Sequence, residues 1–139
     1  MSISVIPYLS FEGDCEEAIR LYMEIFGGEI FFLSRWSELN TQDPERFGKV
    51  MHVEFRAGDT HMSAADSYDR KGPSANIKLM VHMDDPQKAY ATCGQFSRGG
   101  RVISPLQPHP APDDGGMGAI IEDRFGYFWI VTCPNPDKR

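Results

Sequence analysis

The sequence has few cysteines, no long hydrophobic run and no excess of basic residues. Three cysteines in 139 residues are too few and too scattered for a disulfide framework or a zinc knuckle. No apolar run approaches the roughly 20 residues of a membrane span, and no cationic segment precedes a long apolar one, so we expect no signal peptide. The formal net charge of −6 argues against nucleic acid and membrane as partners, because both attract basic surfaces. These absences indicate a cytoplasmic protein.

The hydrophobic content is ordinary for a globular protein. Hydrophobic residues make up 41% of the chain and charged residues 24%, and a chain of this length buries a core without disulfides or metal. Cys15, Cys93 and Cys133 all lie in apolar periodic segments, so we expect buried reduced thiols.

Two apolar runs at the end of the chain predict a β-hairpin. Residues 117–121 and 127–133 are rich in aromatic and β-branched side chains, and a polar turn containing Gly126 joins them. Such a pair is typical of a hairpin near the centre of a sheet. A fainter version occurs at residues 50–65, which suggests a second copy.

The first half of the chain predicts one helix among four strands. Cys15–Phe26 has apolar residues at helical spacing. We expect Asp14 as its N-cap, and Gly27 and Gly28 as an ending in the left-handed helical conformation. Strands are predicted at residues 3–11, 29–36, 49–57 and 60–65, with a long loop at 37–48.

The second half predicts the same order. After a polar linker at 66–76, strands are expected at residues 77–83 and 101–105, followed by the closing hairpin. Asp85 and Pro86 are a cap and a first helical residue for a helix at 86–96. Three pairs of short motifs repeat at a near-constant offset: Asp14 to Ala18 with Asp85 to Ala89, Gly27-Gly28 with Gly99-Gly100, and Arg56 to Gly58 with Arg124 to Gly126. The chain therefore reads as two βαβββ units.

This duplicated order resembles the vicinal oxygen chelate superfamily, which includes glyoxalase I, bleomycin-resistance proteins and extradiol dioxygenases. The opening YLSFEGDCEEAIRLYMEIFGGEI and the closing DRFGYFW look closest to its PhnB-like branch, some members of which carry the name 3-demethylubiquinone methyltransferase. No glycine-rich S-adenosylmethionine loop follows the first strand, so that label has little weight. The resemblance implies an α+β fold of two βαβββ units with cupped mixed sheets, glyoxalase/bleomycin-resistance/dihydroxybiphenyl dioxygenase-like. It also implies a homodimer and a single glyoxalase-like domain over residues 1–139, with repeats at about 3–66 and 76–133.

The resemblance further implies where metal-dependent members hold their metal. Their ligands, typically His, Glu or Gln, come from the first and last strands of each unit. Counting from the glycines places Pro7, Met62, Lys78 and Ile130 at these positions, and none of them is a usable donor for such a metal. A slip of one residue, to Tyr8, His61, Ile77 or Trp129, restores one good ligand. We therefore predict that the metal site is absent, and we predict no cofactor.

His52 and Glu54 are the candidate catalytic residues. They are two apart on a strand and so share a face, while Val53 and Phe55 point toward the core. The pair could be an acid–base pair, ligands of a displaced metal, or a hydrogen-bonded pair at a sheet edge.

The candidate ligand-binding residues are the polar, soft and aromatic side chains that we expect beside a cavity. Lys78, Met80 and His82 share one face of a strand that lines either a cavity or solvent, and Lys78 either holds an anion or is solvent-exposed. Phe128, Ile130 and Thr132 share the other expected cavity face, whereas Trp129 faces a helix. The full ligand-binding set is Trp36, Met62, Lys78, Met80, His82, Phe128 and Ile130.

Three functional hypotheses follow. The first is a metal-free glyoxalase-like protein that binds a small organic molecule in the cup between its sheets. The second is an enzyme of lyase, isomerase or transferase type, in which His52 and Glu54 transfer protons and Lys78 steadies an oxyanion, with a displaced metal as a variant. The third is a regulatory or interaction domain without a ligand.

Overall fold

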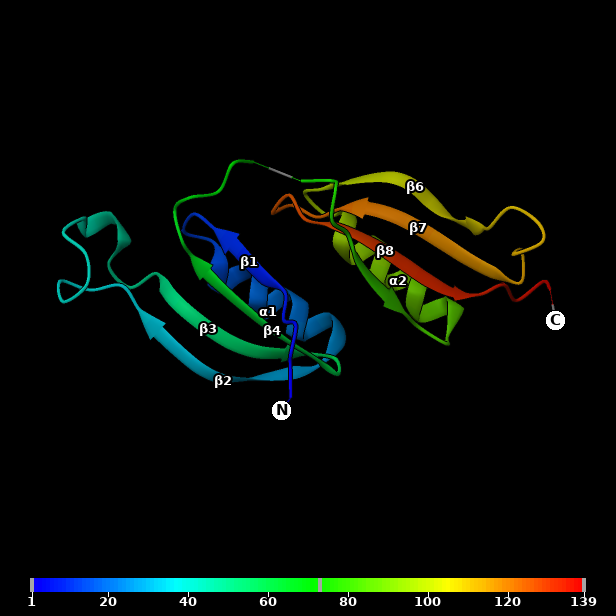
Figure 1. Ribbon diagram of the computed structural model, residues 1–139. Helices are drawn as coiled ribbons and strands as arrows, with labels where there is room; N and C mark the ends of the chain where they lie inside the picture. Colours follow the sequence, from blue (N-terminus) through cyan, green and yellow to red (C-terminus); the bar gives the residue numbers. More distant parts are fainter. Residues whose placement is uncertain (1, 73, 139) are drawn as a thin grey trace. The chain divides into compact units, whose positions relative to one another are not determined.

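The computed structural model describes residues 2–72 and 74–138, in two compact units, Met1–Lys71 and Gly72–Arg139 (Figure 1). Met1, Pro73 in the predicted linker, and Arg139 lie outside the described residues. Each unit has one helix and one four-stranded mixed sheet in the order βαβββ. The predicted duplicated α+β fold is therefore confirmed. That the two units form one domain stays a prediction.

Unit 1 has the sheet order β1-β4-β3-β2. β1 is parallel to β4, and the other neighbours are antiparallel. Its elements are β1 Tyr8–Phe11, α1 Cys15–Phe26, β2 Gly28–Arg35, the 3-10 helix η1 Pro44–Arg46, β3 Val50–Ala57 and β4 Thr60–Asp66.

Unit 2 repeats this topology with the order β5-β8-β7-β6. Its elements are β5 Leu79–His82, α2 Pro86–Ser97, β6 Arg101–Pro108, β7 Gly116–Glu122 and β8 Phe128–Pro134. The closing hairpin, β7 and β8, lies at the centre of this sheet, as the sequence predicts. Both repeats place a glycine against a partner strand: a Cβ on Gly28 would lie 1.7 Å from a backbone oxygen of β3, and one on Gly100 would lie 2.1 Å from the Glu122 carbonyl oxygen.

Each helix covers one face of its sheet (Figure 1). The buried side of α1 includes Ile19 and Tyr22, and the sheet contributes Val53 and Phe55, which are fully buried. In unit 2, Trp129 stacks on Phe96 of α2 with ring centroids 4.7 Å apart, so Trp129 faces the helix as expected. We call the face of each sheet away from its helix the open face.

The N-terminus of α1 differs from the prediction. Asp14 occupies the N-cap position but makes no side-chain cap hydrogen bond. Oδ1 of Asp66, at the end of β4, accepts hydrogen bonds from the backbone N–H groups of Gly13 and Cys15 at 2.6 and 3.0 Å. Asp85 does cap α2 as predicted, because its carboxylate accepts from the Gln87 N–H at 2.9 Å. The α1 cap therefore comes from a residue distant in sequence.

Three further boundaries differ. Gly27 has φ 76° and ψ 163°, which requires a glycine but is not the left-handed helical conformation. The first strand begins at Tyr8 and the first strand of unit 2 at Leu79, later than the apolar patterns indicate. β6 continues to Pro108, because strands at a sheet edge tolerate proline.

Candidate functional site

The open face of unit 1 is built by one row of side chains that crosses all four strands. Tyr8 on β1 pairs with Ser63 on β4, Ser63 pairs with Glu54 on β3, and Glu54 pairs with Phe32 on β2. Directly paired residues point to the same face of a sheet, so these four side chains share the open face. His52, two residues before Glu54, belongs to the same face.

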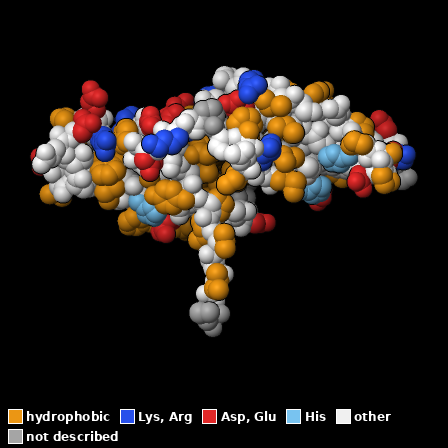
Figure 2. Space-filling model, turned by 45° about the horizontal axis from the view of Figure 1, so that its top comes forward, with side chains coloured by type: hydrophobic (Ala, Val, Ile, Leu, Met, Phe, Trp, Pro, Cys, Tyr) orange, Lys and Arg blue, Asp and Glu red, His pale blue; other side chains and the backbone are white. Residues whose placement is uncertain are grey.

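Aromatic side chains on this face are only half covered. Tyr8, Phe31 and Phe32 are 53%, 49% and 50% exposed. The His52 ring lies between Tyr8 and Phe32, with ring centroids 5.7 and 6.1 Å away. Figure 2 shows a histidine beside hydrophobic side chains on the surface of this unit. Half-exposed rings gathered on one face make this surface a candidate site.

A bulge in β2 enlarges this aromatic surface. The pairing of β2 with β3 shifts by one residue between Ile30 and Phe32, and such a bulge changes the direction of the extra side chain. Phe31 consequently stacks on His61 of β4 with ring centroids 5.1 Å apart.

Tyr8, His52 and Glu54 form a polar chain among the rings. The Tyr8 hydroxyl lies 3.2 Å from His52 Nδ1, and His52 Nε2 lies 3.9 Å from Glu54 Oε1. Burial, with smaller effects from Cys15 and Asp69, raises the pKa of Tyr8, so the phenol keeps its proton and is able to donate it to Nδ1. With Tyr8 as the donor, the neutral ring carries its proton on Nε2. Nε2 is too far from Glu54 Oε1, at 3.9 Å, for a hydrogen bond, so the carboxylate acts on the ring as a nearby charge.

The sequence correctly predicts that His52 and Glu54 share a face, but it does not predict the contact of His52 with Tyr8. The sequence places Tyr8 only at a metal-ligand position in a slipped register. Its contact with His52 is not visible in the sequence, because β4 lies between β1 and β3 in the sheet.

Met62 does not lie on the open face, contrary to the count from Gly58. It pairs with Phe55 and is 4% exposed, on the face that α1 covers. The reason is the length of the hairpin turn. Gly58 belongs to a two-residue turn, because Ala57 pairs with Thr60, whereas five residues separate the paired Glu122 and Phe128 around Gly126. The same count therefore reaches opposite faces in the two units.

The open face of unit 2 holds most of the other predicted residues. Met80 on β5 pairs with Ile130 on β8, and Phe128 lies on the same side of β8 but is 8% exposed. His82 Nδ1 lies 2.8 Å from the Thr132 hydroxyl, and its Nε2 lies 3.3 Å from Asp84 Oδ1.

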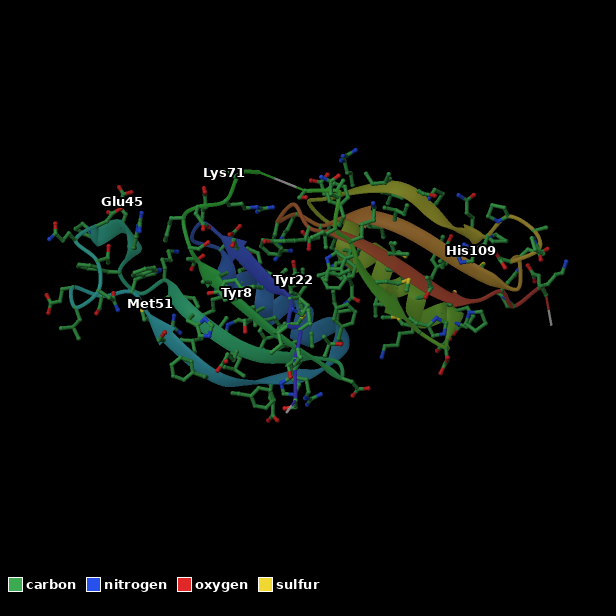
Figure 3. The ribbon with its side chains drawn as sticks, viewed as in Figure 1. Tyr8, Tyr22, Glu45, Met51, Lys71 and His109 are labelled. Atoms are coloured by element: carbon green, nitrogen blue, oxygen red, sulfur yellow. The ribbon has the colours of Figure 1, made fainter. Side chains whose placement is uncertain are left out.

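His109 packs against β7 (Figure 3). A Cβ on Gly118 would lie 2.6 Å from His109 Cε1, so the ring rests on the glycine backbone. Gly118 pairs with Thr132, which places this contact on the open face.

Two predicted ligand-binding residues lie outside the strands that form the two open faces. Lys78 precedes β5, is exposed, and donates to the Ala75 carbonyl oxygen at 2.9 Å. Trp36 follows β2, and its indole N–H donates to the Asp66 backbone carbonyl at 2.9 Å. The Arg46 guanidinium lies 5.9 Å from the Trp36 ring centroid. Trp36 thus fastens the loop that carries η1.

The paired open-face positions on the first and last strands do not fit the metal that the superfamily resemblance implies. On the first and last strands, the paired positions are Tyr8 with Ser63 and Met80 with Ile130. A phenol, a hydroxyl, a thioether and a hydrocarbon do not make a donor set for Zn, Ni, Mn or Fe. Within residues 2–72 and 74–138, no three His, Cys, Asp or Glu side chains come together as a metal site.

A concave region of about 600 Å³ lies beside the N-terminus of α1. Three of the charged side chains that line it, Glu16, Arg20 and Asp66, have partners. Glu16 binds Arg20 and Arg35 at 3.0 and 2.9 Å, and Asp66 binds backbone N–H groups. This region is a less convincing ligand site than the open face.

The duplicated βαβββ fold is that of the vicinal oxygen chelate superfamily, and the family match places the chain in its PhnB-like branch. Residues 3–132 match the family described as 3-demethylubiquinone-9 3-methyltransferase, and the chain belongs to that family. A search among curated proteins finds no match. Across the part of the chain that the structure describes, no helix is long and apolar enough to cross a membrane.

Solved structures share the fold. A PhnB protein from Bacillus cereus is 24% identical, with a TM-score of 0.80 over 94% of this chain and 99% of that one. Protein PA1353 from Pseudomonas aeruginosa is 24% identical, with a TM-score of 0.81 over 96% and 98%. The fosfomycin resistance protein FosX from Listeria monocytogenes is 10% identical, with a TM-score of 0.66 over 100% and 98%.

Proposed function

We propose that the protein binds a small aromatic or hydrophobic organic molecule on the open face of unit 1, without the metal of its superfamily. The observation that supports this proposal is the group of half-exposed rings of Tyr8, Phe31 and Phe32 around His52. Rings of this kind stack on planar ligands. A few polar groups among apolar ones are typical of small-molecule sites.

A thermal-shift screen with small aromatic compounds and organic acids tests the binding proposal. A ligand at 100 times its Kd should stabilise the protein by about 2.7 kcal/mol. Phe32→Ala should weaken the binding of the best compound, because it removes a half-exposed ring. Leu39→Ala is the matched control, because Leu39 is an exposed apolar residue of a loop, 92% exposed. A compound that binds both variants equally would refute the assignment of the site.

Metal analysis of purified, untagged protein tests the second half of the proposal. We expect Zn, Ni, Mn and Fe well below one atom per chain, because the paired positions on the first and last strands, Tyr8 with Ser63 and Met80 with Ile130, carry poor ligands. A stoichiometric metal would contradict it.

An enzyme is the second candidate, and the polar chain Tyr8–His52–Glu54 favours it. In this proposal His52 moves a proton, Tyr8 fixes its tautomer and Glu54 balances its charge. The reaction would be of lyase, isomerase or transferase type. Once a ligand is known, His52→Ala should abolish its turnover and leave its affinity within about threefold. If the native protein turns over no ligand and His52→Ala lowers the affinity for it, the result favours a protein that only binds.

We also propose a homodimer in the cytoplasm. Exposed apolar side chains precede β1, where Ile3 and Val5 are 79% and 93% exposed, and covering them would favour association. Cys15, Cys93 and Cys133 are free thiols, as expected in a reducing compartment. Light scattering on the eluting protein should give twice the mass of one chain, and a monomer at all concentrations would refute the dimer.

A further inference from the structure

A cavity of about 230 Å³ lies in unit 2 between α2 and the strands β6 and β7. It opens to solvent, because Tyr90 and Val102 at its rim are 69% and 50% exposed. No described residue that lines it carries a charge. Its lining includes Cys93, Gly94 and Ser97 on α2, Val102 on β6, and Ala119 and Ile121 on β7.

The helix of unit 1 fills the equivalent space with its own side chains. Aligning the two helices on their cap positions and on the buried Ala18 and Ala89 places Cys93 at the position of Tyr22. Tyr22 is fully buried and is among the largest side chains in the core. Met23 and Phe26 likewise correspond to Gly94 and Ser97, so three large side chains are replaced by small ones.

The strands show the same reduction. Ile30 pairs with Phe55 in unit 1, and the equivalent pair in unit 2 is Val102 with Ile121. Two residues before Phe55 on β3 lies Val53, which corresponds to Ala119, two residues before Ile121 on β7. Each of these three residues is smaller in unit 2. The cavity is therefore the volume that Tyr22 and its neighbours occupy in unit 1.

We propose that this cavity binds a neutral, single-ring aromatic molecule of about the size of a phenol, in the place that the Tyr22 ring takes in unit 1. The size is sufficient, because an apolar cavity of about 150 Å³ in another protein binds benzene. The uncharged lining excludes an ionised ligand, whose burial is costly. This site is on the helix side of unit 2, so it is independent of the open face of unit 1.

The binding is reversible. Cys93 is half-buried, and burial, with a smaller effect of Cys133, raises the pKa of its thiol. The thiol therefore reacts slowly but remains open to a strong electrophile. A phenol has no electrophilic centre, so Cys93 contributes an apolar wall and forms no covalent bond with it.

The test uses 4-methylphenol, which has the tyrosine side chain, and the full-length protein. We expect saturable amide NMR shifts confined to α2, β6 and β7. The compound should also protect Cys93 from a maleimide, because Cys15 and Cys133 are buried. Shifts in β1, β3 and β4 instead, or no saturable shift up to the solubility limit, would overturn the proposal and leave the open-face proposal standing.

Variants that refill the cavity provide the second arm. Cys93→Tyr restores the side chain of unit 1 and should weaken binding of 4-methylphenol at least tenfold. Lys88→Tyr adds the same ring to an exposed position of α2 and should leave the affinity unchanged. If Cys93→Tyr does not fold, Ser97→Phe fills the cavity from the next turn and decides the question. Unchanged affinity in a folded filling variant would refute the site.

Discussion

Asp66 should be one of the largest polar contributors to the stability of unit 1. Its side chain is 1% exposed. Oδ1 accepts from the N–H groups of Gly13 and Cys15, and Oδ2 accepts from the Val50 N–H at 2.9 Å. One carboxylate therefore joins the entry to α1 with the first residue of β3.

The cost of removing this carboxylate follows from the three donors that it leaves without an acceptor. A buried donor without a partner costs about 1–3 kcal/mol. Two of the three donors, the N–H groups of Cys15 and Val50, are buried, so Asp66→Ala should destabilise the protein by about 2–6 kcal/mol. Asp66→Asn keeps one acceptor but turns an amide donor toward a backbone N–H, and should cost about 2 kcal/mol or more.

Urea denaturation with two matched aspartates measures this prediction. Asp14→Ala should cost under about 0.5 kcal/mol, because Asp14 makes no cap hydrogen bond. Asp85→Ala removes a real cap and should cost about 1 kcal/mol. If Asp66→Ala proves no more costly than Asp14→Ala, water replaces the carboxylate and the reasoning fails.

Three other predictions concern glycines and a surface ion pair. Gly28→Ala should cost more than about 3 kcal/mol, because its Cβ would lie 1.7 Å from a backbone oxygen. Gly94→Ala, with open space around it in a helix, should stabilise the protein by about 0.5–1 kcal/mol. Thermal denaturation measures both, and a change in stability of the same sign in the two variants would contradict the predictions. Hydrogen bonds from Arg35 lower the pKa of Glu16 from 4.5 to about 2, so its stabilisation is complete above pH 4.5 and is lost as the pH falls toward 2. Since the pair is partly exposed, Glu16→Gln should remove at most about 1 kcal/mol at pH 7 and nothing near pH 2. Glu24→Gln, at an exposed position of the same helix, is the matched control.

Local patterns predicted the elements well because the signals for them are local. The spacing of Ala18, Ile19, Tyr22 and Ile25 gives α1 its observed bounds, and the Asp85-Pro86 pair gives the start of α2. The cap of α1 could not be predicted, because Asp66 is some fifty residues distant in sequence. Nothing local distinguishes an aspartate that caps from one that does not.

The candidate site was predicted only in part, because side-chain direction depends on register. His52 and Glu54 share a face by the period of two within one strand, which needs no knowledge of the neighbours. Met62 was placed on the wrong face, because its direction depends on the length of the turn at Gly58. A single residue in a turn reverses every side chain of the following strand.

The period of two also explains how one duplicated topology carries two different surfaces. Substitutions on one face of a strand leave the other face unchanged, so the helix side and the open side of each sheet are free to diverge. Unit 1 fills its helix side with Tyr22 and Phe55 and leaves aromatic rings half exposed on its open side. Unit 2 keeps a cavity on its helix side, beside Cys93. If the cavity were only a packing defect, Cys93→Tyr would stabilise the protein and no aromatic compound would bind the native chain. Stabilisation of the native chain by 4-methylphenol, and its loss in that variant, would instead assign unit 2 a ligand of its own.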